Sequence, residues 1–175
     1  AGAIVEAIEN HDVVITSGGV SAGEEDHVKA AIQRHGSIDL WRLAIKPGRP
    51  IAFGQINNAT LIGLPGNPVA AMVTFMVIAQ PVLLMLMGAA EVSIPRYSVK
   101  ADFEYKKKVG RREWVRGILS SGSSSELVVK KFRSSGAGIL TSMVEADGLV
   151  ELPEDQASVS RGDVIQFLPF SGVLG

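Results

Sequence analysis

At 175 residues, the chain is long enough for one ordinary domain or for two small ones, each with its own buried core. Hydrophobic residues make up 46% of it and the formal net charge is −1, which excludes a disordered chain and a polybasic nucleic-acid-binding protein. Cysteine is absent, which excludes disulfides, thiolate metal ligands and catalysis through sulfur.

The first segment, AGAIVEAIEN, has the pattern of an amphipathic helix, but no capping residue and no initiator methionine precede it. We therefore expect the chain to be a piece of a longer protein. The start also lacks the basic segment, apolar run and cleavage site of a secretory signal. The prediction is a cytoplasmic protein.

Strands and helices alternate over the first half of the chain. The β-branched run from Asp12 to Thr16 predicts a buried strand that ends in a glycine loop, and DHVKAAIQRHG predicts a helix. Then follow IDLWRLAI, the loop KPGRP, the strand PIAFGQI, a turn at Asn57 and Asn58, the strand TLIGL and the loop PGNP. Such alternation is typical of an α/β layer with a mostly parallel sheet, whose ligands bind at the carboxyl ends of the strands.

A long apolar segment, from Val69 to Met87, has no charged residue and is just long enough to span a bilayer. Gln80 and Pro81 near its centre, and the absence of Lys or Arg beside either end, count against a membrane span. A helix that is apolar all round is also what a protein core or a dimer interface requires. We predict such a helix, with no membrane partner.

The composition changes from Gly88 to Pro95, where it becomes small and polar, so we predict domains over residues 1–88 and 89–175. Beyond Arg96, short apolar or alternating runs broken by Gly, Ser and Pro predict a small all-β domain, a barrel or a sandwich. Within it, the cluster KKKVGRREW, from Lys106 to Trp114, could bind an anionic surface. The preferred interpretation is a charged strand edge that discourages edge pairing.

The glycine loop SGGVSAGEED, from Ser17 to Asp26, runs from a strand end to a helix start. Its glycines let the backbone approach an anion, while Glu24 and Asp26 could hold Mg²⁺ against phosphate oxygens. The alternative is ordinary architecture, because acidic residues favour helix N-termini in any case. The residues of this loop alone leave both readings open.

Two further loops offer complementary groups. In IKPGRP, two prolines stiffen a turn that presents Lys46, a point charge, and Arg49, which can grip an anion with two N–H groups. In GLPGNPVA, from Gly63 to Ala70, backbone N–H groups could close the same pocket. The alternatives are a solvent-exposed basic turn for the first loop and a well-formed helix start for the second.

The motifs GGVSAGEED, AIKPGRPIAFG and GLPGNPVAAMVTF, in this order and at this spacing, resemble the molybdopterin molybdenumtransferase family, which includes MoeA and the gephyrin E domain. The stretch from EWVRGIL through SSGAGILTSMVEADGLVELPED to RGDVIQFLPF resembles the last domain of that family, so the resemblance covers essentially the whole chain. It implies an α/β domain of the MogA type, without its first strand, followed by a small all-β barrel-like domain.

The resemblance also implies roles for individual residues. Asp26, with Glu24 beside it, matches the acidic residue of the Mg²⁺ and molybdate site, and Lys46 and Arg49 match two basic positions that receive the anion. The positions that match binding of adenylylated molybdopterin come from all three loops: Ser17, Gly18, Gly19, Ser21, Gly23, Gly48, Pro65, Gly66, Asn67 and Pro68.

The implied reaction is Mg²⁺-dependent: adenylylated molybdopterin and molybdate give molybdenum cofactor and AMP. The resemblance further implies a homodimer and a contact with molybdopterin adenylyltransferase. Two departures stand out, because the family commonly has Lys at the position of Arg49 and some members have Ser at that of Ala137. The upstream strand with a Thr-Gly-Asp-Glu loop is absent, so we expect the fragment alone to be inactive.

Two other functions stay open. A molybdopterin adenylyltransferase shares the α/β layer, but the attached β domain and the GLPGNP loop favour the molybdenumtransferase. A scaffold or binding module is the alternative of a different class, because one member of the family clusters receptors through this domain.

Overall fold

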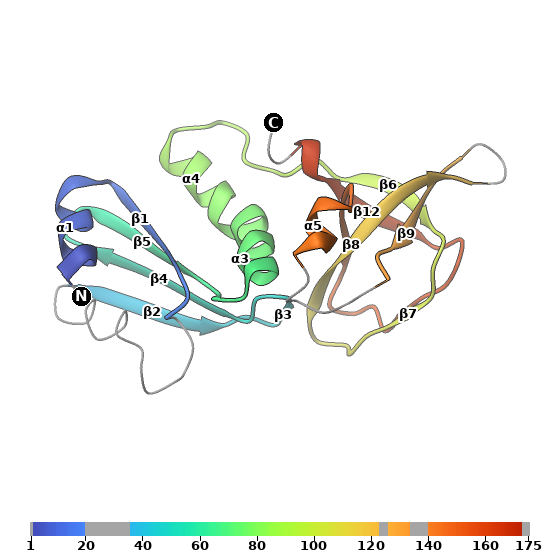
Figure 1. The fold of residues 1–175 in the computed structure, drawn as a ribbon, viewed down its shortest axis with the longest axis horizontal. Helices are drawn as coiled ribbons and strands as arrows, with labels where there is room; N and C mark the ends of the chain where they lie inside the picture. The colour runs from blue at the N-terminus through green and yellow to red at the C-terminus, as the bar shows by residue number, and fades with distance from the viewer. Residues whose placement is uncertain (1, 20–35, 123–125, 134–139, 173–175) are drawn as a thin grey trace.

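The computed structural model describes residues 2–19, 36–122, 126–133 and 140–172. These residues form two units that lie side by side along the long axis of the molecule (Figure 1). A four-stranded sheet with helices makes up the first unit, and a small closed barrel makes up the second. This order confirms the predicted fold class, an α/β domain followed by a barrel-like β domain.

The sheet of the first unit contains β1 (Val13–Ser17), β5 (Ala59–Leu64), β4 (Pro50–Ile56) and β2 (Ser37–Arg42), in that spatial order. Helix α1 (Gly2–Asn10) packs Ile8 on this sheet. Strand β1 pairs with β5 in parallel, but β4 pairs antiparallel with both β5 and β2. The described sheet is therefore mixed rather than mostly parallel as expected. For β4 and β5, the physical reason is the turn at Asn57 and Asn58, because so short a connection can only join antiparallel strands.

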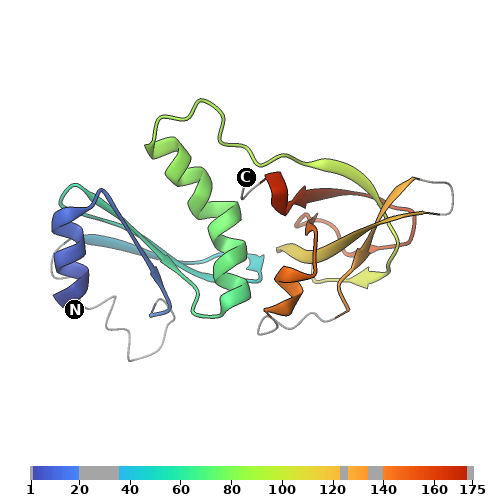
Figure 2. The ribbon, with the colours of Figure 1, turned by 45° about the horizontal axis from the view of Figure 1, so that its top comes forward.

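The long apolar helix consists of α3 (Pro68–Thr74), the π-helical segment η1 (Phe75–Ala79) and α4 (Gln80–Leu86), which form one continuous rod (Figure 2). Asn67 caps it, because its side-chain oxygen accepts a hydrogen bond from the Ala70 N–H at 3.3 Å. The first half is buried against both units, whereas α4 has no buried residue, and 64% of Met85 is exposed.

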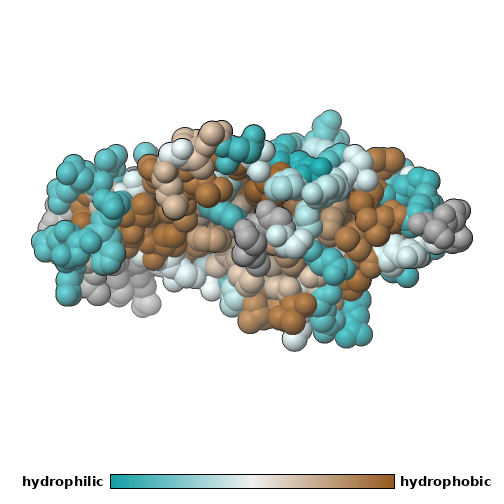
Figure 3. Space-filling view, turned by 90° about the horizontal axis from the view of Figure 1, so that it is seen from above, coloured by the Kyte–Doolittle hydropathy of each residue, from teal (hydrophilic) through white to brown (hydrophobic). Residues whose placement is uncertain are grey.

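The surface beside α4 is apolar (Figure 3). A shallow cavity there is lined by side chains of the sheet and the helix: Leu43, Ile51, Phe53, Ile62, Ile78, Ala79 and Val82. By length and composition, the helix Pro68–Leu86 could cross a membrane, because its mean hydropathy is 2.3. In the structure, 33% of its most apolar 18-residue stretch is buried. Core helices of soluble proteins meet the same criteria, so the expected absence of a membrane partner stays a prediction.

The second unit begins after a connection over residues 87–96. Its barrel is a ring of five strands, β10 (Gly148–Leu152), β12 (Val164–Pro169), β6 (Tyr97–Ala101), β9 (Leu127–Lys131) and β8 (Arg112–Ser121), closed by pairing of β8 with β10. Short β7 (Tyr105–Lys106) and β11 (Ser158–Val159) pair beside it, and α5 (Thr141–Val144) and η2 (Phe170–Gly172) cover one end. Val129, Val150 and Phe167 lie in the barrel core.

The interpretation of Lys106–Trp114 as a charged strand edge is wrong for its last residues, Arg112–Trp114. Strand β8, which begins at Arg112, pairs with β9, β10 and β3 (Ile45–Lys46), so it has no free edge there. Closure of the barrel removes the edge that the charges were expected to protect.

A second core joins the two units. Strand β3 leaves the first sheet and pairs in parallel with β8, and this splits the segment IDLWRLAI between two sheets. Ile45, Val69 and Val73 of the first unit pack with Trp114 and Leu149 of the barrel. The KPGRP loop, which follows Ile45, is thereby held against the barrel.

Candidate binding pocket between the two units

The glycine loop and the PGNP loop meet at one end of the sheet, because β1 and β5 are parallel neighbours that end together. The Gly18 N–H donates to the Leu64 carbonyl at 3.0 Å, and the Ser17 hydroxyl donates to the Pro65 carbonyl at 3.3 Å. Gly18 has φ +85°, and a Cβ on Gly66 would lie 3.3 Å from the Gly18 Cα. The positive φ therefore favours glycine at position 18, and the close approach of the two loops favours it at position 66.

The KPGRP loop packs against the second of these loops. Gly48 has φ +96°, and a Cβ there would lie 2.3 Å from the Thr74 Cγ2 and 3.6 Å from the Pro65 Cγ. The Leu43 N–H donates to the Arg49 carbonyl at 2.8 Å, which closes the loop at its base. All three loops that the sequence pointed to thus meet around Pro65 and Gly66.

A cavity of about 420 Å³ lies between these loops and the barrel. The first unit contributes residues 45–50, 65–67 and 70, and the barrel contributes side chains from β7, β8 and β9 and their ends. Its walls are largely apolar, with Trp114 and Phe132 among them. The buried indole N–H of Trp114 has no hydrogen-bond partner in the described part of the chain, so it is a donor that a ligand could satisfy.

Positive charge dominates the polar part of the described lining. Its basic side chains are Lys46, Arg49, Arg111, Arg116 and Lys131, and its one carboxylate is Glu113. An apolar cavity with a few convergent cations is typical of a site for an anionic organic ligand.

The carboxylate of Glu113 is completely buried and joins both units. It accepts a hydrogen bond from the Tyr105 hydroxyl at 2.7 Å and one from the Arg111 Nε at 2.7 Å, and it lies 3.3 Å from the Lys46 Nζ. Burial raises the pKa of Glu113, but these three partners outweigh it, and the pKa lies below its usual value. The carboxylate is therefore ionised at neutral pH.

Two barrel cations stand close to this group. Arg116 is 4% exposed and donates from Nε to the Ser142 hydroxyl at 3.1 Å. The Lys131 Nζ lies 5.7 Å from the centre of the Tyr105 ring, and the Lys46 Nζ lies 5.9 Å from it. Burial lowers the pKa of Arg116, and burial together with the charges of Arg116 and Lys46 lowers the pKa of Lys131. Such cations repel one another, and an anion between them would relieve that repulsion.

The structure places the sequence-predicted residues in three groups. Those that line the cavity are Lys46, Gly48, Arg49, Pro65, Gly66 and Asn67. Ser17, Gly18 and Gly19 lie beside this lining in the neighbouring loop, and Pro68 begins the helix. Ser21, Gly23, Glu24, Asp26 and Ala137 lie outside the described residues. For Asn67 and Pro68, the architectural reading as a helix start holds whether or not they also contact a ligand.

The barrel residues of the pocket were missed by reasoning from sequence. Arg111 and Glu113 belong to Lys106–Trp114, which was interpreted as a charged strand edge, and no role was predicted for Tyr105, Arg116 or Lys131. One signal could have found Glu113: it alternates with Val115 in a strand pattern, so both face the same side of β8, the side of the barrel core.

A magnesium site is not visible in the described residues, among which no group of three His, Asp or Glu side chains could hold a metal ion. Glu24 and Asp26, which the resemblance assigns to Mg²⁺, lie outside them.

Comparison with known families divides the chain into two consecutive parts. Residues 1–85 match a family described as "Probable molybdopterin binding domain", and residues 98–170 match "MoeA C-terminal region (domain IV)". The second match covers the barrel, which supplies half of the pocket.

Individual relatives agree with these families. The molybdopterin molybdenumtransferase of Haemophilus influenzae is 37% identical over 174 residues, which are 99% of this chain and 43% of that protein. The molybdenum cofactor synthesis protein cinnamon of Drosophila melanogaster is 35% identical over 92% of this chain and 28% of its own length. A crystal structure of the molybdopterin biosynthesis MoeA protein of a Pyrococcus species has a TM-score of 0.76 and 28% identity, covering 97% of this chain and 40% of that one. The chain spans less than half the length of each.

Proposed function

The chain belongs to the MoeA family of molybdopterin molybdenumtransferases, and on that premise we propose that the protein containing it inserts molybdate into adenylylated molybdopterin in a Mg²⁺-dependent reaction that releases AMP. The observation that carries the proposal is the surplus of positive charge in the pocket. Among the described lining residues, Lys46, Arg49 and Lys131 are basic, and the one carboxylate, Glu113, is also paired with Arg111. Both substrates are anions.

The size and lining of the pocket support an organic anion together with a small oxyanion. A volume of about 420 Å³ falls in the ordinary range for small-molecule sites and exceeds what a tetrahedral oxyanion alone would fill. The apolar wall of Trp114 and Phe132 suits a flat heterocycle, and the unpartnered indole N–H offers it a hydrogen bond.

In the proposed mechanism, the chain binds and orients two anions and stabilises negative charge. Lys46 and Arg49 attract molybdate from the loop side, and Arg116 and Lys131 face them from the barrel. Because the site is largely apolar, these charges act more strongly than they would in water. Mg²⁺, which we assign to Asp26 and Glu24, would supply a template for the pyrophosphate oxygens of the substrate.

The shared pocket favours this reaction over adenylyl transfer. An adenylyltransferase needs only the α/β layer, whereas here the barrel contributes Tyr105, Glu113, Arg116 and Lys131 to the same cavity. A scaffold function is the alternative that the measurement of AMP release would support if it found no activity.

The test is AMP release from adenylylated molybdopterin by the full-length protein, with molybdate and Mg²⁺. We expect release to require molybdate, to fail in Asp26→Ala, and to fall by about 100-fold in Arg116→Ala, the usual effect of removing one charge-stabilising donor. Arg161→Ala is the matched control, because Arg161 is an exposed barrel arginine outside the pocket. A folded wild type that releases no AMP would instead support the scaffold.

Three predictions about location and assembly belong to the same proposal: a cytoplasmic location, a homodimer, and a contact with molybdopterin adenylyltransferase. The exposed apolar side chains Met85, Leu86 and Met87 at the end of α4 support an interface there. Sedimentation of the full-length protein as a monomer would count against the dimer.

A further inference from the structure

The strongest feature beyond the proposed anion ligands is the hydrogen-bonded path from Lys46 to Glu113. Strand β3 pairs with β8 so that Lys46 and Glu113 are direct partners and their side chains point to the same side. The Lys46 Nζ donates to the Tyr105 hydroxyl at 3.1 Å, and that hydroxyl donates to the Glu113 Oε2 at 2.7 Å. Arg111 holds the other oxygen, Oε1. The lysine is therefore held by a barrel group that is itself fixed.

An ammonium group held in this way still has a donor to offer. Lysine has three N–H donors, and here Tyr105 accepts one, while Glu113 lies 3.3 Å away as an ion-pair partner. The Lys46 side chain is 41% exposed and lines the cavity, whereas that of Glu113 is 0% exposed. Any ligand contact must therefore come from Lys46, since Glu113 has no surface left.

We propose that Glu113 and Tyr105 are positioning residues, which hold the Lys46 ammonium at the barrel side of the pocket so that it presents an N–H group to a bound anion. The identity of that anion as molybdate rests on the proposed function. The positioning itself does not, because it concerns contacts within the chain.

The physical reason is the flexibility of lysine. A free lysine side chain loses much rotamer freedom when it binds a ligand, and a preformed contact removes that cost from the binding step. Glu113 also supplies a negative counter-charge for the cations around Tyr105. Its own negative charge is offset by the two cations paired with it, Lys46 and Arg111, which limits its repulsion of an incoming anion.

The first experiment measures the position of Lys46 without any ligand. The full-length protein is treated with a limiting amine-acetylating reagent, and acetylation of each lysine is followed by mass spectrometry. We expect Glu113→Gln to raise the rate at Lys46 by about threefold or more, because a lysine released from its ion pair moves more freely and meets the reagent more often. Tyr105→Phe should act in the same direction with a smaller effect, and the exposed Lys106 serves as the internal standard.

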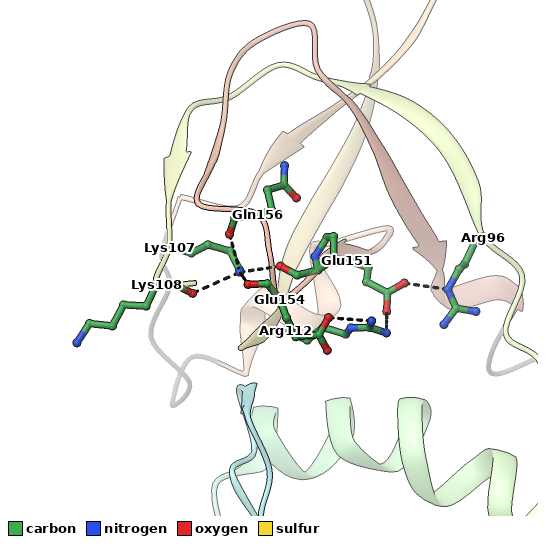
Figure 4. Close-up of polar contacts among 8 residues, drawn as sticks. Arg96, Lys107, Lys108, Arg112, Glu151, Glu154 and Gln156 are labelled. Carbon is green, nitrogen blue, oxygen red and sulfur yellow. Dashed lines mark hydrogen bonds and ion pairs between the residues drawn. The ribbon is translucent and has the colours of Figure 1, made fainter. Parts of the chain in front are cut away.

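The matched control for this experiment is Glu151→Gln. Glu151 is another buried barrel carboxylate with two basic partners, Arg96 and Arg112, but it does not line the pocket (Figure 4). It should leave acetylation of Lys46 unchanged. Unchanged acetylation of Lys46 in both Glu113→Gln and Tyr105→Phe would overturn the proposal, whatever the protein binds.

The second experiment measures binding of molybdate alone by calorimetry, in a double-mutant cycle. In the wild-type background, Glu113→Gln should weaken binding by about tenfold, which corresponds to one lysine losing its preformed position. In the Lys46→Ala background, the same substitution should not weaken binding, because it then only removes a negative charge. A merely structural role would weaken binding equally in both backgrounds, and that result would overturn the proposal.

The two experiments separate the inference from the proposed function. Faster acetylation of Lys46 in a protein that binds no molybdate would support the positioning and count against the proposed substrate. Tighter molybdate binding by Glu113→Gln would mean that the carboxylate competes with the anion for Lys46, which contradicts the positioning.

Discussion

The barrel buries two carboxylates, Glu113 and Glu151, that have similar partners and different surroundings. They are 0% and 7% exposed, and each forms ion pairs with two basic side chains. Their strands, β8 and β10, are paired, with Glu113 opposite Leu152 and Glu151 opposite Trp114. Because side chains alternate along a strand, Glu113 points to the inside of the barrel and Glu151 to the outside.

The outer cluster is balanced and closed. Arg96 Nε lies 2.8 Å and Arg112 Nη1 lies 3.0 Å from the two oxygens of Glu151, and Arg112 Nη2 lies 3.0 Å from Glu154, as Figure 4 shows. Two cations thus meet two anions. The inner cluster pairs Lys46 and Arg111 with Glu113 alone, and Arg116 and Lys131 stand beside it. The comparison teaches that a surplus of positive charge around a cavity, rather than the presence of ion pairs, distinguishes a binding site from a structural network.

The largest expected effect comes from the floor of the pocket. Gly48→Ala would place a methyl 2.3 Å from the buried Thr74 Cγ2, at φ +96°. Overpacking and backbone strain together should lower the free energy of unfolding by about 3 kcal/mol. Gly110→Ala, at φ +88° with nothing within 4 Å, carries the strain without the clash and should cost about 1 kcal/mol. Urea unfolding compares the two, and equal losses would mean that Thr74 moves aside.

The next prediction tests whether the two carboxylates contribute differently to the free energy of unfolding or only to ligand affinity. Glu113→Gln and Glu151→Gln should each lower the free energy of unfolding by about 2 kcal/mol, because each removes the charge of a buried carboxylate from two basic partners, although Arg112 keeps its ion pair with Glu154. Only Glu113→Gln should change the affinity for molybdate. A loss of affinity in Glu151→Gln would show that the outer cluster acts on the pocket through the fold.

Two lysines, Lys107 and Lys131, allow the same comparison with smaller expected effects. Lys107 Nζ donates to the Pro153 carbonyl at 2.7 Å and to the Gln156 carbonyl at 2.8 Å (Figure 4), so Lys107→Met should cost about 1 kcal/mol of stability and no affinity. Burial, together with the charges of Arg116 and Lys46, lowers the pKa of Lys131. Lys131→Met should therefore leave the free energy of unfolding within about 0.5 kcal/mol and weaken molybdate binding. A large loss of stability in Lys131→Met would contradict the assignment of Lys131 to the ligand.

The smallest expected effect is a pH dependence from Glu113. Its pKa is lower in the folded chain than in the unfolded one, so the unfolded chain binds the proton more tightly. This contribution to the free energy of unfolding is present above about pH 4.3, the ordinary value for Glu, and is lost as the pH falls through the folded pKa. The free energy of unfolding, measured with urea between about pH 3 and 6, should therefore fall less steeply with decreasing pH in Glu113→Gln than in the wild type. An equal pH dependence of the free energy of unfolding in the two proteins would contradict this contribution of Glu113.

Much of the fold could be predicted from local patterns. The apolar helix with its Asn-Pro start, the glycine and proline loops, and the change to short strands after Gly88 follow from backbone sterics, capping and periodicity, which act over a few residues. The same local patterns identified three loops as candidates for the binding site. The parallel pairing of β1 with β5 then placed two of them at the same edge of the sheet.

The rest depended on contacts between residues far apart in the chain. No local pattern shows that β3 crosses to the barrel, that β8 closes a ring, or that Lys46 and Glu113 become cross-strand partners. Alternation tells which residues of β8 share a face, but which face is inside is decided only when the other strands close around it. Lys46 could thus be singled out from its loop, whereas Glu113, Tyr105 and Lys131, which surround it, are brought there by tertiary structure alone.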